Sequence, residues 1–432
     1  MTQMAMEDNK RILYVTTRLF WPPDSGRKVT LYHYCEGMHE QYGYEVHVFS
    51  FLEDDQFAEM VTNKPDFISS VAVADRVSAL EKAKNVIKAV FDSEMPFQCC
   101  LFQSKSNRVG LRCLVESLQP DVVIFDMVRL APYADSLKGL GCAIIMNFDD
   151  LLSKRYIRQL GRSGNNVLGK YGAGMPGLIN HLINGPMKNA VLKLEAGRIA
   201  RAEEKYGKEA DACLLVSPLE AKELGSRIGE KRCFSATVGA NLLGPFDRDA
   251  EKKYEFGFVG NMHTSANQDS LRYITEEIMP KIPNAQLRVI GVCPDEVRRE
   301  YENNASVSFT GRIDSVAFHL NQCSALLAPF AYGTGVKTKV LEAMGMGIPV
   351  VTNSIGLEGL AAERSKDILC ADTADELASE ACRLLEDETL RHQIATAGRE
   401  YVEHCHTWES SIADLVECLN FAIAERKSRQ FV

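Results

Sequence analysis

Residues Pro329 to Leu360 read PFAYGTGVKTKVLEAMGMGIPVVTNSIGLEGL. An apolar run over 325–330 leads into this stretch and has the composition of a buried parallel strand. A loop with two glycines follows, and residues 336–346 then place apolar side chains on one face at helical spacing. Gly347 ends the predicted helix, and residues 350–352 form the next predicted strand. The stretch therefore predicts a βαβ unit whose glycine loop precedes the helix.

The start of this helix has the features of an anion site. Free backbone N–H groups and the helix dipole attract negative charge, and Lys337 and Lys339 add positive charge. Glu342 lies one turn further on, where a carboxylate is unfavourable beside a phosphate unless it binds something else, such as a ribose diol. The alternative is a plain βαβ crossover with solvated lysines.

The spacing Gly-x-x-x-Lys-Val-Leu-Glu-Ala-Met, then Gly-x-Pro-Val-Val, resembles the donor-site motif of family 4 GT-B glycosyltransferases. The resemblance implies an α/β fold of two doubly wound, Rossmann-like domains that face each other across a cleft. It implies that this motif binds the diphosphate and ribose of a nucleotide-sugar, with Lys339 in a catalytic role. The donor-binding residues implied here are Thr334, Gly335, Val336, Lys337 and Glu342.

Length and composition agree with a soluble two-domain protein. The chain has 432 residues, 46% of them hydrophobic and 25% charged, and no apolar run long enough to span a membrane. The net charge of −9 argues against a nucleic-acid partner. The 13 cysteines are scattered without C-x-x-C pairs, which predicts neither a zinc site nor a disulfide framework. The polar N-terminus is not a secretion signal, so we expect a cytoplasmic protein.

The order of predicted elements divides the chain into three parts. Residues 1–240 are expected to form an acceptor-side Rossmann-like domain, and 241–405 a nucleotide-sugar-binding one. Residues 406–432 are expected to form a closing helix that crosses back to the first domain, as GT-B proteins have.

The first predicted strand, 11–16, leads into a loop that reads Pro-Pro-Asp-Ser-Gly. This loop lies at the carboxyl edge of the sheet, where ligands of doubly wound domains bind. It resembles the first loop of bacterial polysaccharide glycosyltransferases, which approaches the donor phosphate and the acceptor. Ser25, Gly26 and Arg27 are the candidate contacts, although Arg27 could equally be a surface arginine.

A second candidate follows the predicted strand at 141–148. The sequence there resembles the Asp-rich turn of exopolysaccharide sugar transferases, with Asp150 and Ser153 in register and Asn147 in place of a frequent aspartate. Asp150 could orient or deprotonate the acceptor hydroxyl. Alternatively, Asp149 or Asp150 caps the next helix, and the two roles are compatible.

Residues 160–190 form a glycine- and asparagine-rich insertion that is too long for an ordinary connection. The wider range 151–208 contains 11 basic and 3 acidic residues. It could contact an anionic membrane surface or receive a lipid-phosphate acceptor. A flexible surface insertion is the alternative.

The second domain opens with a strand at 256–259 followed by Gly260 and Asn261. This segment resembles the family's strand and Gly-x-Met loop, in which the glycine lets backbone approach the donor. Asn261 could bind phosphate or sugar. Arg312 ends the predicted strand at 307–312, and Gly311-Arg312 resembles the turn that places backbone near the nucleotide base.

One position departs from the family pattern. Many family 4 enzymes have a glutamate that contacts the transferred sugar eight positions before the equivalent of Glu342, where this chain has Thr334. The polysaccharide branch often lacks that glutamate too, so we interpret the change as a branch feature.

The resemblance implies transfer of a sugar from a nucleotide-sugar to a glycan, lipid-linked or other acceptor, with retention and without a metal or cofactor. If the enzyme inverts instead, Asp150 becomes a required base. The alternatives are a nucleotide-sugar 2-epimerase of the same fold and a silent nucleotide-sugar-binding scaffold. The sequence does not specify the donor, the acceptor, the linkage or the oligomeric state.

Overall fold

The computed structural model describes residues 10–23, 26–53, 56, 58–91, 94–160, 185, 188–240, 252–333 and 335–430. Two candidate site residues, Ser25 and Thr334, and most of the predicted insertion at 160–190 lie outside these ranges.

The chain divides into two compact units. Unit 1 comprises residues 1–237 together with 408–432, and unit 2 comprises 238–407. The boundaries expected from the sequence were 240/241 and 405/406.

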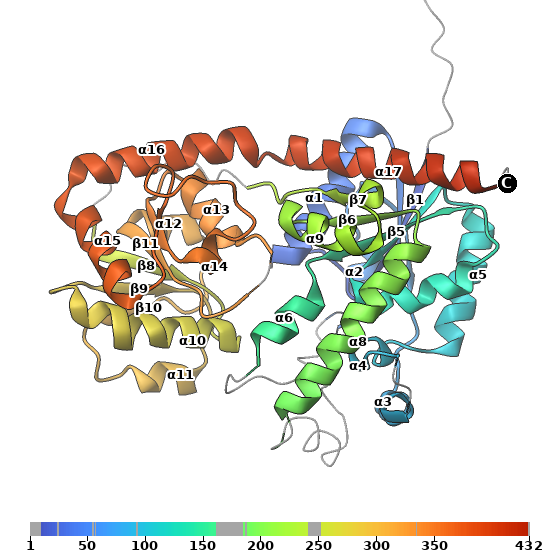
Figure 1. The fold of residues 1–432 in the computed structure, drawn as a ribbon, viewed down its shortest axis with the longest axis horizontal. Helices are drawn as coiled ribbons and strands as arrows, with labels where there is room; N and C mark the ends of the chain where they lie inside the picture. Colours follow the sequence, from blue (N-terminus) through green and yellow to red (C-terminus); the bar gives the residue numbers. More distant parts are fainter. Residues whose placement is uncertain are drawn as a thin grey trace, which may run out of the picture. The chain divides into compact units, whose positions relative to one another are not determined.

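Unit 1 is built on a seven-stranded, wholly parallel sheet with the order β3-β2-β1-β4-β5-β6-β7 (Figure 1). Its central strands are short runs of buried, mostly apolar residues, as the sequence predicts, whereas β3 and β7, which the sequence analysis did not predict, are largely half-buried or exposed. Strand order reverses between β1 and β4, which makes the carboxyl ends of these strands the topological switch point. The strands are β1 (Arg11–Thr16), β2 (Glu45–Ser50), β3 (Ile68–Val73), β4 (Val122–Asp126), β5 (Ala143–Asp149), β6 (Ala212–Leu215) and β7 (Cys233–Ser235).

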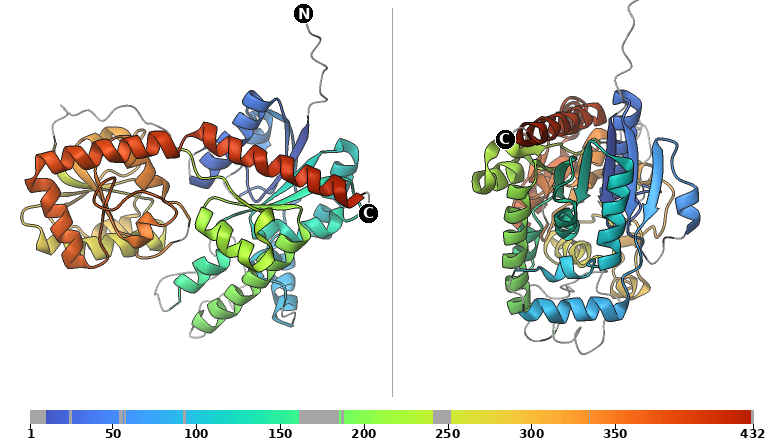
Figure 2. Two further views of the ribbon diagram at one scale, coloured as in Figure 1. Left: turned by 45° about the horizontal axis from the view of Figure 1, so that its top comes forward. Right: turned by 90° about the vertical axis from the view of Figure 1, so that its right-hand side faces the viewer.

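Helices cover both faces of this sheet. The helices of unit 1 are α1 (Gly26–Tyr42), α2 (Ala58–Thr62), α3 (Ala79–Phe91), α4 (Phe97–Cys100), α5 (Lys105–Leu118), α6 (Leu152–Arg158), α8 (Lys188–Glu209), α9 (Pro218–Ile228) and α17 (Trp408–Gln430). Helix α17 ends at the C mark in Figures 1 and 2 and packs on α1. A Cβ atom at Gly37 would lie 2.1 Å from Ile412 Cδ1, so this glycine allows the two helices to meet. The predicted closing helix therefore belongs to unit 1.

Unit 2 contains a second parallel sheet, of six strands, with the order β10-β9-β8-β11-β12-β13. Its switch point lies between β8 and β11. The strands are β8 (Tyr254–Val259), β9 (Leu287–Ile290), β10 (Val307–Phe309), β11 (Cys323–Ala328), β12 (Val350–Thr352) and β13 (Leu369–Cys370). The helices are α10 (Ser265–Tyr273), α11 (Asp295–Glu300), α12 (Val316–Asn321), α13 (Thr338–Gly345), α14 (Ser354–Leu357), α15 (Ala374–Glu386) and α16 (Glu388–Cys405).

The βαβ unit predicted first is present as β11, α13 and β12, with β11 and β12 paired in parallel. Val340, Leu341 and Met344 form the buried face of α13, as their spacing predicts. Two doubly wound parallel sheets confirm the predicted fold class.

Candidate active site

The loop between β11 and α13 leads into the helix through backbone N–H groups that the helix itself does not use. Gly335 has φ of 66°, a left-handed conformation that suits glycine. Lys337 is the N-cap residue, and its side chain does not cap the helix. Within the described ranges, the backbone N–H groups of Gly335, Val336, Thr338 and Lys339 donate to no other group. These donors lie at the positive end of the helix dipole, which is the arrangement that the predicted anion site requires.

Lys339 lies in the first turn of α13 and points its ammonium group back toward β8. Its Nζ donates to Oδ1 of Asn267 at 2.9 Å and lies 5.1 Å from the ring centre of Phe330 and 5.4 Å from that of Phe258. Burial, together with the nearby charge of Lys337, lowers the pKa of Lys339 to about 8, and Glu342 opposes this shift. An anion bound here would stabilise the charged ammonium.

Asn267 links α13 to the loop after β8. Its Nδ2 donates to the backbone oxygen of Asn261 at 2.8 Å, while its Oδ1 accepts from Lys339. A Cβ atom at Gly260 would lie 2.9 Å from Cγ and Nδ2 of Asn267. Gly260 thus leaves space for the Asn267 side chain. The sequence analysis had explained this glycine only by the approach of the donor. The exposed Asn261 uses its Oδ1 to accept from the N–H of His263 at 2.9 Å.

The Lys337 side chain folds back on its own loop. Its Nζ donates to the backbone oxygen of Gly335 at 2.6 Å, and only 8% of the residue is exposed. Lys337 therefore stabilises the loop shape that presents the N–H groups. Its direct contact with a phosphate remains a prediction.

Glu342 is half-buried, one turn beyond Lys339. Burial raises the pKa of Glu342 to about 7, and the positive charge of Lys339 opposes the rise. No hydrogen bond or ion pair to this carboxylate occurs within the described ranges. A desolvated carboxylate without a partner can accept hydrogen bonds from a diol.

Arg312 lies apart from α13, after the edge strand β10. It is exposed and follows Gly311, whose backbone bridges to Gly291. Its predicted contact with a nucleotide base stays a prediction.

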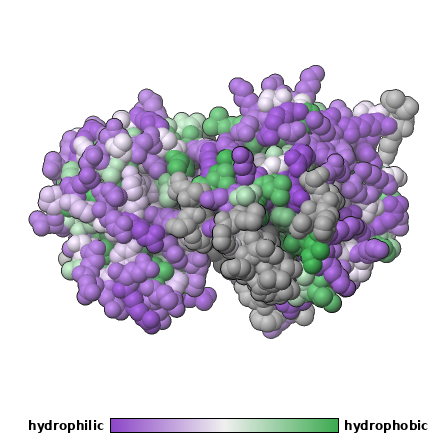
Figure 3. All heavy atoms as spheres, turned by 60° about the horizontal axis from the view of Figure 1, so that its bottom comes forward, coloured by the Kyte–Doolittle hydropathy of each residue, from purple (hydrophilic) through white to green (hydrophobic). Residues whose placement is uncertain are grey.

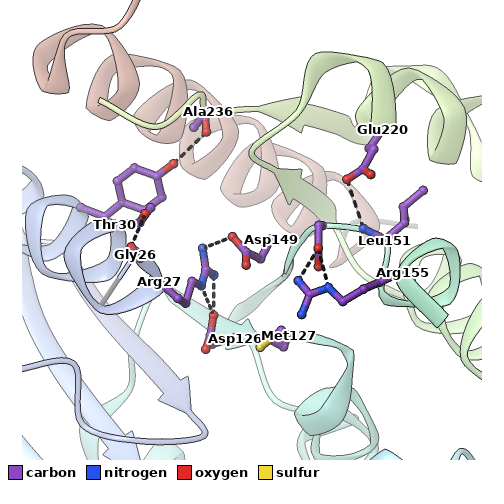
Figure 4. A network of polar contacts seen from close by, with 12 residues as sticks. Gly26, Arg27, Thr30, Asp126, Met127, Asp149, Leu151, Arg155, Glu220 and Ala236 are labelled. Carbon is purple, nitrogen blue, oxygen red and sulfur yellow. Dashed lines mark hydrogen bonds and ion pairs between the residues drawn. The ribbon is translucent and has the colours of Figure 1, made fainter. Parts of the chain in front are cut away.

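In unit 1, Arg27 begins α1 at the sheet's switch point, and its side chain is buried rather than on the surface. Its Nε donates to Oδ1 of Asp126 at 3.0 Å and its Nη1 donates to Oδ1 of Asp149 at 2.8 Å (Figure 4). A third contact joins Nη2 to Asp126. The guanidinium thus ties α1 to the carboxyl ends of β4 and β5. A phosphate at Arg27 would have to compete with two carboxylates.

Asp150 faces a second arginine. Its Oδ2 accepts from Nε of Arg155 at 3.0 Å and also from Nη2, and its side chain is 3% exposed. Asp149 is more open, at 19%, and burial raises its pKa while Arg27 opposes the shift. Both carboxylates therefore have arginine counterions, as Figure 4 shows for Asp149 with Arg27.

The predicted cap of α6 by Asp149 or Asp150 is wrong. Leu151 is the N-cap residue, and its side chain makes no capping hydrogen bond. Two glutamates from other helices replace the cap: Glu220 accepts from the N–H of Leu151 at 3.2 Å, and Glu203 accepts from the N–H of Ser153 at 3.1 Å. Carboxylates at a helix N-terminus satisfy its free donors and complement its dipole.

The sequence analysis missed Asp126, although the rule that selected Asp150 applies to it as well. Asp126 ends β4 and is aligned with Asn147 of β5. Oδ2 of Asp126, both amide atoms of Asn147, the Tyr14 hydroxyl and the Thr17 hydroxyl are buried without hydrogen-bond partners in the described structure. The carboxyl edge of unit 1 is thus polar and rich in acceptors.

The described residues contain no group of three or more His, Cys, Asp or Glu side chains arranged to hold a metal ion. None of the helices in the described ranges combines the length and apolar composition needed to cross a bilayer. On the face drawn in Figure 3, described residues are mostly hydrophilic, with hydrophobic atoms gathered in smaller patches.

Known proteins share both the unit-2 sequence pattern and the fold. Residues 253–387 match the family model described as Glycosyl transferases group 1. Sucrose-phosphate synthase from Thermosynechococcus elongatus is similar in structure, with a TM-score of 0.67 and 15% identity over 96% of this chain and 100% of that one. HepE from Anabaena, solved with UDP and glucose, has a TM-score of 0.65 and 12% identity over 95% and 100% of the two chains.

A TarM mutant from S. aureus was solved with Fondaparinux, alpha-GlcNAc-glycerol and UDP. It has a TM-score of 0.64 and 10% identity over 95% of this chain and 100% of that one. The matched range 253–387 contains all the described donor-site residues of unit 2. The chain therefore carries a glycosyl transferases group 1 domain and has the two-domain fold of the GT-B glycosyltransferases.

Proposed function

We propose that unit 2 binds the nucleotide-sugar donor at the start of α13, and that the sugar passes with retention to a glycan, lipid-linked or other acceptor. The observation that carries this proposal is the grouping of free N–H donors, the Lys339 ammonium and the unpartnered Glu342 carboxylate within one turn of α13. The family domain over 253–387 supports sugar transfer as the chemistry.

Each group has a distinct task in this proposal. The N–H groups of Gly335, Val336 and Thr338 hold the diphosphate, and Lys339 neutralises the charge that grows on it as the sugar leaves. Glu342 accepts hydrogen bonds from the ribose diol. The structure of HepE solved with UDP-glucose supports a nucleotide-sugar as the donor.

The carboxylates of unit 1 support retention. Asp150 is paired with Arg155, whose positive charge stabilises the ionised carboxylate and disfavours its action as a base. Asp149 is engaged by Arg27, although burial raises its pKa. In a retaining transfer the leaving diphosphate takes the acceptor proton, and no protein base is needed. We propose that Asp149 and Asp150 orient the acceptor hydroxyl.

The proposed membrane contact would involve the described part of 151–208. Helix α8 exposes Lys193, Leu194, Arg201, Lys205 and Lys208. Sedimentation with phosphatidylglycerol vesicles tests this contact directly, and the loss of binding at high salt would identify it as electrostatic.

Replacing Lys339 with alanine tests the donor site. We expect kcat/KM to fall by about 100- to 1,000-fold, the effect of removing one donor that stabilises transition-state charge. Lys366→Ala, at an exposed lysine of unit 2, is the matched control. A donor is first found by thermal-shift screening of nucleotide-sugars. Normal turnover by Lys339→Ala would refute the site, and conversion of the donor without any acceptor would identify a 2-epimerase.

A further inference from the structure

Two hollows adjoin on the outer side of α1 in unit 1, with volumes of about 490 and 770 Å³. They share Tyr32, Lys64 and Pro65 and together form one groove, the α1 groove. Its remaining lining residues are Trp21, Pro22, Pro23, Glu59, Met60 and Asn63 in the smaller hollow and His39, Glu40, Asp66 and Phe67 in the larger.

The α1 groove starts at the ligand-binding edge of the unit-1 sheet. Trp21, Pro22 and Pro23 belong to the loop that leaves the carboxyl end of β1 and enters α1 close to Arg27. From Tyr32 to Glu40 the groove follows α1 for about 12 Å, at 1.5 Å per residue. It therefore extends from the candidate acceptor edge toward the far end of the domain, as a site for an elongated ligand would.

The wall of the α1 groove near that edge is built on aromatic rings, of which Trp21 and Phe67 are 5% and 6% exposed and Tyr32 is half-buried. Nε1 of Trp21 donates to the backbone oxygen of Met60 at 2.8 Å, which fixes the indole in the wall. Tyr32 packs edge-to-face on Phe67, with ring centres 4.9 Å apart. The half-buried Tyr32 ring, held by Phe67, is thus a rigid aromatic surface against which the C–H face of a sugar ring can pack at a low entropic cost.

The polar groups of the groove favour hydroxyl-bearing ligands over anions. Three carboxylates, Glu40, Glu59 and Asp66, line it, while its one lysine, Lys64, donates to the backbone oxygen of Ile68. In the described structure, the side chains of Tyr32, Asn63 and Asp66 have no hydrogen-bond partner. Hydroxyl groups can donate to the carboxylates and accept from the amide and phenol, whereas a phosphate would be repelled.

We infer that the α1 groove binds a neutral oligosaccharide, namely the part of the acceptor remote from the reacting hydroxyl. This inference rests on the proposed function, because it assigns the acceptor to the class of neutral glycans. A lipid-phosphate head group is the competing ligand, and the charges of the groove disfavour it.

Tryptophan fluorescence gives a direct test, because the chain has only two tryptophans, Trp21 and Trp408. The full-length Trp408→Phe protein retains Trp21 alone, in the groove wall. We titrate it with maltoheptaose, cellohexaose and chitohexaose, and separately with phosphatidylglycerol vesicles and inorganic phosphate. A saturable change with at least one oligosaccharide, and none with the vesicles or phosphate, is expected.

Variants of Tyr32 identify the site. We expect Tyr32→Ala to weaken oligosaccharide binding by about 2- to 10-fold, the range for one aromatic contact. Tyr32→Phe, which keeps the ring, should stay within about twofold of the parent. Tyr42→Ala removes another tyrosine from α1 that is exposed and does not line the groove, and it should bind normally. Circular dichroism and melting curves confirm that each variant is folded.

Three outcomes would overturn the inference: no response to any of the three oligosaccharides at about 10 mM, a response only to vesicles or phosphate, or equal losses in Tyr32→Ala and Tyr42→Ala. Nucleotide-sugar binding is measured on the same samples by thermal shift. If the nucleotide-sugar binds and the oligosaccharides do not, only the α1 groove assignment fails. If the nucleotide-sugar also fails to bind, the proposed function fails.

Discussion

The ammonium group of Lys339 lies 2.9 Å from the side-chain oxygen of Asn267, although 72 positions separate the two residues in the chain. Asn267 also binds the backbone oxygen of Asn261, in the loop after β8. β8 and β11 are neighbours at the switch point of the unit-2 sheet, so Asn267 joins the two loops that meet there. It holds the lysine in place without adding charge to the anion site.

Asn267→Ala should therefore lower kcat while leaving the protein folded. A hydrogen bond to a charged group contributes about 1.5–3 kcal/mol, so we expect a loss of about 10- to 100-fold. Asn267→Asp keeps an acceptor for Lys339 and adds a negative charge, so it should shift the alkaline limb of the pH–rate profile to higher pH. Wild-type kcat in Asn267→Ala, with an unchanged alkaline limb, would show that the contact has no role in turnover.

Donor affinity should be highest between pH 7 and pH 8. Burial raises the pKa of Glu342 to about 7, so the carboxylate gains a proton and loses acceptor strength below this pH. Burial lowers the pKa of Lys339 to about 8, so the ammonium loses its charge above this pH. Calorimetric titration with a nucleotide-sugar from pH 5.5 to 9.5 should give a bell-shaped affinity profile, because the sugar diphosphate itself does not titrate in this range.

Two substitutions assign the limbs of this profile. Lys339→Arg keeps its charge at high pH, so the alkaline limb should disappear even if the affinity is lower overall. Glu342→Gln cannot ionise, so the acid limb should flatten. If both limbs persist in both variants, other groups control donor binding.

Gly260→Ala should reduce donor turnover by displacing Asn267. The new Cβ atom would lie 2.9 Å from the Asn267 amide, so the side chain has to move away from Lys339. We expect Gly260→Ala to show most of the tenfold or larger loss of kcat that is expected for Asn267→Ala. The double variant Gly260→Ala/Asn267→Ala should be no worse than Asn267→Ala alone, since the clash is gone. Additive losses would mean that Gly260 is needed for direct contact with the donor. Gly110→Ala, at a helical position where a Cβ atom meets no neighbour, is the control for the effect of the substitution on the backbone.

The sequence predicted the features that depend on local spacing. The apolar period of α13 and the glycines before it correctly placed the helix and its preceding loop at the carboxyl edge of β11, while the anion site itself stays a prediction. The same reasoning located most strands of both sheets to within a few residues, because these are short buried runs between turn residues. It missed β3 and β7, whose residues are largely half-buried or exposed and therefore give no continuous apolar signal.

Contacts between distant residues could not be predicted in this way. Arg27 is separated by 99 and 122 positions from the two carboxylates that it binds, so its sequence neighbours gave no sign of burial. Lys337 sits at a position that favours phosphate contact, yet its flexible stem reaches its own loop instead. The α6 cap comes from helices 50 and 69 positions away, so no local capping signal exists.

That distant cap predicts how the stability of unit 1 depends on pH. Oε1 of Glu203 accepts from the N–H of Ser153, and its Oε2 accepts from the Ser153 hydroxyl at 2.5 Å. Burial nevertheless raises the pKa of Glu203 to about 7 from its ordinary 4.5, against these hydrogen bonds. The folded state therefore holds the Glu203 proton more tightly than the unfolded state does. The resulting contribution of this proton to the free energy of unfolding is complete below about pH 4.5 and is lost as pH rises to about 7.

Glu203→Gln should remove this dependence, since an amide can accept from the Ser153 N–H and donate to its hydroxyl at any pH. A proton that is bound in one state only changes the free energy of unfolding by at most about 1.4 kcal/mol per pH unit. Urea unfolding at half-unit steps from pH 4.5 to 8 should thus show a shallower slope in the variant by up to this amount. Part of the slope remains, because burial also raises the pKa of Glu195 to about 7. Glu417→Gln, at an exposed glutamate of α17, should leave the slope unchanged, and an equal slope in Glu203→Gln would contradict the titration of Glu203 in this range.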